Sequence, residues 1–183
     1  MKHLEFRLQP EAVRPILDSV QPLLMSLEDN LATEAVPPEE DEMLVDFWKT
    51  DLLNAQRKDV AAIVEVFSDD FLDTGRATLR QENVDHFLRG CSALRLKIRE
   101  SILSDLDDLD LEKGEVDFDA LDLDQKNGYA AYALFASLIE LVVYQYEFGA
   151  ETEMGEGDGE FEDVDEDELD FGDEDDSKDD FWK

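Results

Sequence analysis

The chain has 183 residues, of which 50 are acidic and 16 basic, so its formal net charge is −34. Charge of this sign repels nucleic-acid phosphates and anionic lipid headgroups, so neither direct nucleic-acid binding nor membrane binding is expected. An apolar content of 43% is enough for the core of one domain. Cys91 is the single cysteine and no apolar signal opens the sequence, so we expect a cytoplasmic protein without an intrachain disulfide.

A short strand and a helix come first in the chain. Apolar and charged residues alternate over residues 2–8, which predicts a half-buried strand. Apolar residues then recur at helical spacing from Pro10 to about residue 31, and proline suits the first turn of a helix. Pro15 and Pro22 interrupt this spacing, so we predict a kinked helix or two joined helices.

A second amphipathic stretch runs from about residue 39 to 67, after the break at Pro37 and Pro38. Thr50 is a candidate cap for a second segment within it. Residues 73–75, Asp-Thr-Gly, then predict a turn. The inner face of this stretch is predicted to hold Leu44, Phe47, Trp48, Leu52, Ala55, Ile63 and Phe67.

Residues 78–81, Thr-Leu-Arg-Gln, fit a capping box and predict a helix over about 79–103. One face of this helix carries a continuous apolar stripe that includes Cys91. The basic side chains lie mostly off the stripe and form the one basic region of the sequence: Arg80, Arg89, Arg95, Lys97 and Arg99. This region is interpreted as a solvated face, as a partner for the protein's own acidic segments, or as a surface for an anionic partner.

Residues 104–124 hold ten carboxylates and one lysine, and they predict a charged loop that ends at Asn127-Gly128. The stretch 129–148 is apolar on nearly every side. It is close to the length of a membrane span, but Glu140, its acidic flanks and the absence of a Lys/Arg cluster favour a central helix surrounded by other helices.

These patterns predict an all-α fold: a single helical bundle domain over residues 1–149 with one short N-terminal strand. Residues 150–183 are predicted to form a disordered acidic tail, because they have too little apolar surface to offset the chain entropy lost on folding.

No catalytic or metal-binding motif is visible. A calcium loop starting at Asp108 would place Lys113 at the sixth position, where such a loop requires the glycine that here follows one residue later. His3 and His86 are the only histidines, and neither has the spacing of a zinc or di-iron site. We therefore expect no metal, no cofactor and no enzyme activity.

Cys91 lies on the apolar stripe and is predicted to be a small buried hydrophobe. An alternative is a redox-responsive thiol, because Arg89 and Arg95 would lower the pKa of an exposed cysteine at this position.

Residues 151–183 contain 18 acidic and 2 basic residues, a net charge of −16, yet aromatic residues recur among them. The tail is either a solubility tail or a binding segment, in which Phe171, Phe181 and Trp182 would anchor to a partner. Arg89, Arg95 and Arg99 would then form a counter-surface for the tail or for another anionic ligand.

The sequence as a whole predicts a non-enzymatic interaction or regulatory protein whose acidic tail and 105–124 loop engage a basic protein surface. One alternative is a nucleic-acid mimic that occupies the groove of a nucleic-acid-binding protein. The other is a redox-responsive regulator that uses Cys91.

Several segments resemble an uncharacterised helical family of bacterial proteins, domain of unknown function 2017. The resemblance extends over about residues 4–148, although Leu134 and Ser137 stand where the family has tryptophan. It implies a helical domain with a short N-terminal strand and no established catalytic residues. The segments that carry it are Leu8–Glu11, Thr50–Leu52, Phe87–Arg89, Leu94–Leu96, Tyr132 and Leu138–Glu140.

Overall fold

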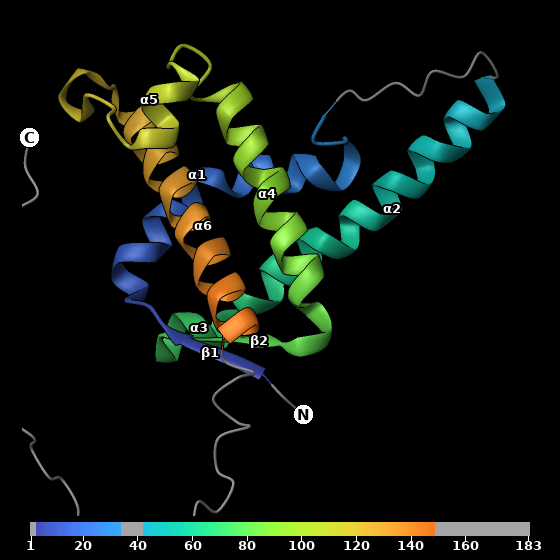
Figure 1. The fold of residues 1–183 in the computed structure, drawn as a ribbon, viewed down its shortest axis with the longest axis horizontal. Coiled ribbons are helices and arrows are strands. Elements are labelled where there is room, and N and C mark those ends of the chain that lie inside the picture. Colours follow the sequence, from blue (N-terminus) through green and yellow to red (C-terminus); the bar gives the residue numbers. More distant parts are fainter. Residues whose placement is uncertain (1–2, 34–41, 149–183) are drawn as a thin grey trace, which may run out of the picture.

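The computed structural model describes residues 3–33 and 42–148, and the predicted tail lies outside them. The described chain is mostly helical with one small sheet, as predicted (Figure 1). Its elements are β1 (His3–Arg7), α1 (Pro10–Asp29), α2 (Glu42–Val66), α3 (Asp69–Thr74), β2 (Arg76–Arg80), the 3-10 turn η1 (Gln81–Asn83), α4 (Val84–Ser101), α5 (Asp108–Lys113), the 3-10 turn η2 (Phe118–Ala120) and α6 (Leu123–Phe148).

The predicted N-terminal strand is confirmed, and it pairs with a strand that the sequence reading missed. β1 and β2 are antiparallel, with His3 opposite Arg80. Ala77 and Leu79 of β2 are buried, while the residues between them are exposed. The predicted capping box at 78–81 is therefore wrong: residues 78–80 belong to β2, residue 81 opens the 3-10 turn η1, and α4 begins only at Val84.

α1 is a single helix that continues through both of its internal prolines. Pro15 and Pro22 are exposed, and so are Glu11 and Asp18, whose carbonyls have no amide partner four residues on. Water can satisfy those carbonyls, because the buried positions of α1 lie on its other side. The exposed position of the prolines thus explains why the helix is not divided.

α4 is the central helix, contrary to the expectation for 129–148. It packs on α2 along one side and on α6 along the other, and its Phe87, Leu94 and Ile98 are fully buried. α6 packs against α1 and α4 through one face, and only 28% of its most apolar window is buried. By length and composition alone, α6 is the one helix of the described chain that could cross a membrane.

The acidic segment, residues 104–124, is more regular than the predicted loop because its own side chains cap its turns. Asp107 accepts a hydrogen bond from the Leu109 amide at the start of α5, at 2.8 Å. Asp122 and Gln125 bond each other's backbone amides, at 2.8 and 3.1 Å, at the start of α6. α6 therefore begins before the predicted Tyr129, and Asn127-Gly128 lies inside the helix.

The first half of α2 projects beyond the helices that cover its second half (Figure 1). The buried residues of α2 begin only at Gln56 and continue through Asp59, Ile63 and Val66. The prediction of one inner face along the whole stretch is therefore wrong at its start. Four large apolar side chains in this half are exposed: Met43, Leu44, Phe47 and Leu52.

Candidate functional site

Arg89 lies in an interhelical charge cluster with His86 on the same helix and Asp59 on α2. The Asp59 carboxylate is buried, with its side chain 9% exposed. It accepts two hydrogen bonds from Arg89, from Nε at 3.2 Å and from Nη2 at 3.1 Å. The hydrogen bond to Asp59 raises the pKa of Arg89 above its usual value, and burial opposes this in part. Arg89 therefore compensates a buried acid of its own chain.

His86 completes this cluster from the same side. Its Nδ1 lies 2.6 Å from Oδ1 of Asp59 and 3.0 Å from Nη2 of Arg89. An Asp–His pair of this kind orients the general base in hydrolases. In the described chain, however, no serine, threonine or cysteine side chain bonds to His86. Within the described residues, the cluster joins α2 to α4.

Arg95 faces the other neighbour of α4. Its guanidinium carbon lies 4.3 Å from the centroid of the Tyr132 ring on α6, which is cation–π geometry. Its Nε is buried and has no hydrogen-bond partner among the described residues. Arg95 is thus the one of the three predicted arginines for which the described structure shows no carboxylate.

Arg99 holds the turn that follows α4. It donates to the backbone carbonyls of Leu103 and Leu106, at 2.7 and 3.0 Å, and its Nε lies 2.5 Å from a carboxylate oxygen of Asp108. These bonds fasten the start of the acidic segment to α4. The three arginines therefore do not form one open stripe, because they point to α2, to α6 and to the acidic segment respectively.

Cys91 is completely buried among the core residues, in the position that the apolar stripe predicts. Burial raises the pKa of its thiol well above the usual value, and the nearby Arg95 offsets only part of this effect. The thiol is therefore neutral at physiological pH and has no route to solvent in this conformation.

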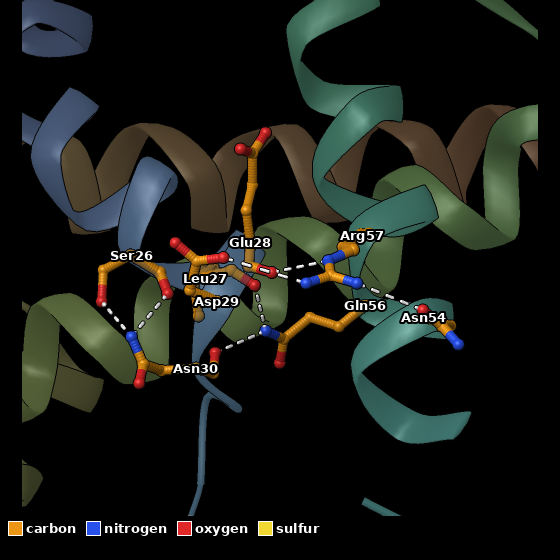
Figure 2. Close-up of polar contacts among 8 residues, drawn as sticks. All are labelled: Ser26, Leu27, Glu28, Asp29, Asn30, Asn54, Gln56 and Arg57. Carbon is orange, nitrogen blue, oxygen red and sulfur yellow. Dashed lines mark hydrogen bonds and ion pairs between the residues drawn. The ribbon is translucent and has the colours of Figure 1, made fainter. Parts of the chain in front are cut away.

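A second polar network joins the end of α1 to α2 (Figure 2). Gln56 is buried, accepts from the Ala32 amide at 2.9 Å, and donates to the carbonyls of Leu27 and Asn30. Arg57 donates to the Glu28 carbonyl at 2.7 Å. These side chains satisfy carbonyls that the last turn of a helix leaves without amide partners.

This network forms part of the wall of an open cleft of about 840 Å³ between the end of α1, the projecting half of α2 and the last turns of α4. Lys49 and Lys97 enter it from α2 and α4, and Asp29 and Glu100 lie beside them. Lys97 pairs with Glu100 at 3.4 Å. The lining of the cleft thus contains two lysines and two acidic residues, so its formal charge is balanced.

Sequence reasoning missed Gln56 and Asp59, yet a signal for both was available. They lie on the inner face of α2 between Leu52 and Ile63, where helical spacing calls for apolar residues. A polar residue at such a position requires a buried partner. The partners come from α1 and α4, which only the tertiary structure identifies.

The remaining predicted partner-binding residues, Phe171, Phe181 and Trp182, lie outside the described residues. Within residues 3–33 and 42–148, no group of three or more histidine, cysteine or acidic side chains is arranged to hold a metal ion. The acidic side chains that are near one another thus do not converge into a coordination site in this part of the chain.

Comparisons with protein-family models, with curated proteins and with solved structures each returned no match to this chain, so the resemblance to the domain of unknown function 2017 family remains a prediction.

Proposed function

We propose that this protein is a non-enzymatic interaction protein that engages a basic surface of a partner protein through its acidic residues. The observation that carries this proposal is that basic side chains of α4 are paired with acidic residues of the same chain. Arg89 and Arg99 are held by Asp59 and Asp108, so they are committed within the chain. Apart from Asp59, the acidic residues whose burial the structure describes are exposed to solvent, where they attract cationic surfaces.

The acidic segment supports this proposal because it presents carboxylates from ordered turns. Asp110, Glu112 and Asp119 are exposed, and their carboxylates take no part in the capping bonds or in the ion pair with Arg99. Carboxylates on fixed turns lose less conformational entropy on binding than those on a flexible loop. The tail would add affinity through its charge and through Phe171, Phe181 and Trp182.

Of the two alternatives, the redox-responsive regulator has the less support. Cys91 is buried and its raised pKa keeps the thiol protonated, whereas sensor cysteines are exposed thiolates.

A nucleic-acid mimic is distinguished by competition: DNA would displace the protein from a captured partner that uses a nucleic-acid groove. A partner that does not bind DNA would contradict this alternative.

Affinity capture from the native cell followed by mass spectrometry tests the proposal. The bait carries Asp110→Asn, Glu112→Gln and Asp119→Asn, and it is compared with the wild-type chain at low and at high salt. A control bait with Asp18→Asn, Asp70→Asn and Asp73→Asn makes the same change of charge on α1 and α3. We expect the first bait, and not the control, to lose partners that wild type captures only at low salt.

A second bait addresses the tail. It is the full chain with Phe171→Ser, Phe181→Ser and Trp182→Ser, which keeps every charge of the tail. Loss of the same partners would support the tail as a binding segment. If this bait and the neutralised acidic segment both retain the wild-type partners, the proposed function is wrong.

A further inference from the structure

The projecting half of α2, residues 43–55, is unusual because a helix of about four turns that makes few tertiary contacts is marginal in water. In a chain of this charge, its tip would be expected to be polar. Met43, Leu44 and Phe47 are instead 80%, 52% and 66% exposed. Apolar groups that cluster at an exposed site mark an interaction surface.

These three side chains share one side of the helix, because Phe47 follows Met43 by four residues and Leu44 by three. We call them the α2 patch. On α2 the cleft is lined by Lys49, Thr50 and Leu53. Lys49 and Leu53 lie on another side of the helix, whereas Thr50 follows Phe47 by three residues and borders the patch. Leu44 and Phe47 are exposed, and the residues of the bundle that the structure describes leave much of both side chains uncovered.

The charges that flank the α2 patch are acidic. Asp46 lies three residues after Met43, and Asp51 lies four residues after Phe47, so both are adjacent to the patch on the helix surface. Both are exposed, and neither forms an ion pair in the described structure. The next cation on this side of the helix, Lys58, lies about two turns beyond Asp51.

We propose that the α2 patch binds an amphipathic helix of a partner protein, with an aliphatic face against Leu44 and Phe47 and flanking lysine or arginine side chains near Asp46 and Asp51. This inference rests on the proposed function: the α2 patch would be a second, partly apolar contact with the same basic partner. A second copy of this chain fits less well, because each copy carries a net charge of −34 and the two would repel. The acidic tail has the wrong sign for the same reason.

The test uses a fluorescein-labelled synthetic helix of about 18 residues, long enough to cover the projecting half, with leucines on one face and lysines on both flanks. Binding to the full chain is measured by fluorescence anisotropy at about 150 mM salt, where long-range attraction is screened. A scrambled peptide of the same composition measures the nonspecific electrostatic binding of a cationic peptide to this protein. We expect the amphipathic peptide to bind more tightly than the scrambled one.

Three variants of the full chain locate the contact. Leu44→Ala with Phe47→Ala is expected to weaken binding of the amphipathic peptide about tenfold or more, because exposed anchors dominate such contacts. Asp46→Lys with Asp51→Lys is expected to weaken it and to reduce its salt dependence. Leu96→Ala with Leu109→Ala, which removes exposed leucines from α4 and α5, is the matched control and is expected to bind as wild type does.

The outcomes separate this inference from the proposed function. Wild-type binding by the Leu44→Ala, Phe47→Ala variant overturns the inference, whereas the acidic-segment and tail baits still decide the proposed function. Equal affinity for the amphipathic and scrambled peptides also overturns it. Sedimentation that shows a wild-type dimer and a monomeric Leu44→Ala, Phe47→Ala variant would assign the α2 patch to a second copy and overturn the proposed occupant.

Discussion

Gly90 of α4 lies directly against the backbone of Asp59 on α2. A Cβ atom at Gly90 would be 2.5 Å from the Asp59 carbonyl oxygen and 3.0 Å from Cδ1 of Ile63. The absence of a side chain thus lets the two helices approach closely enough for Arg89 and His86 to reach the Asp59 carboxylate. The close packing of α2 against α4 and the Asp59 charge cluster therefore both depend on Gly90.

Replacement of Gly90 by alanine is expected to destabilise the protein by about 2–3 kcal/mol. Alanine favours a helix by about 1 kcal/mol over glycine, but here its Cβ overlaps a backbone atom that a side-chain rotation cannot move away. Urea unfolding monitored by circular dichroism measures the change. Ser92→Ala, at an exposed position of the same helix, is the control and should change stability by no more than about 0.5 kcal/mol. A Gly90→Ala protein as stable as wild type would contradict this account of the crossing.

Gln56→Leu is expected to cost about 2–4 kcal/mol of stability, although leucine has similar size and is more apolar. The substitution removes the partners of the Leu27 and Asn30 carbonyls and of the Ala32 amide, and buried polar groups without partners are costly. The same urea titration measures the loss. Asn54→Ala removes only an exposed acceptor of Arg57 and should have little effect. Similar stabilities for the two variants would show that water replaces Gln56.

The bond between Asp59 and Arg89 is expected to have a coupling energy of about 1 kcal/mol in a double-mutant cycle of Asp59→Asn and Arg89→Gln. The Asp59 carboxylate is buried, but the Arg89 side chain is 56% exposed, so solvent screens the pair and limits its coupling energy. Lys97 and Glu100, an exposed pair three residues apart on α4, provide the comparison. Their coupling should be smaller, at most about 0.5 kcal/mol, and the prediction is wrong if the two cycles give equal values.

The Cys91 thiol is expected not to react with a thiol-specific reagent in the native protein and to react fully once the protein is unfolded in urea. Burial both blocks access and keeps the thiol protonated, whereas the thiolate is the reactive form. Absorbance of the released chromophore measures the extent of reaction. Rapid labelling of the native protein would instead show that the core opens around α4, and it would restore the redox alternative.

The raised pKa of Cys91 also predicts a pH dependence of stability. Above the usual thiol pKa of about 8.5 the unfolded chain loses this proton, while the folded protein retains it. The contribution of Cys91 to stability is therefore complete below that pH and falls above it, by up to about 1.4 kcal/mol per pH unit. Cys91→Ala lacks this slope. The difference in unfolding free energy between wild type and Cys91→Ala should narrow from pH 8 to pH 10, and a constant difference would contradict the prediction.

Local patterns of the sequence determined much of the secondary structure. Alternation over residues 2–8 was sufficient for β1, and helical spacing was sufficient for α1 and for most of α4. Gly75 at the end of α3 has a positive φ of 71°, as the predicted turn requires. The acidic excess and the apolar position of Cys91 also follow from the residues alone. These features depend on neighbours in the chain, which the sequence displays directly.

Other features were decided only when distant segments met. The last residues of β2, 78–80, fit the start of a helix because a capping pattern and a short strand look alike until β1 provides a partner. The apolar face of α2 was predicted along its whole length, since periodicity shows which side is apolar but not where the covering helices end. Three arginines share α4 but contact residues on different sides of it: Arg89 bonds to Asp59, Arg95 lies over Tyr132, and Arg99 bonds to Asp108. Sequence alone therefore determined most of the helices, strand β1 and the charge, whereas tertiary packing decided which side chains are satisfied within the fold and which are left to contact a partner.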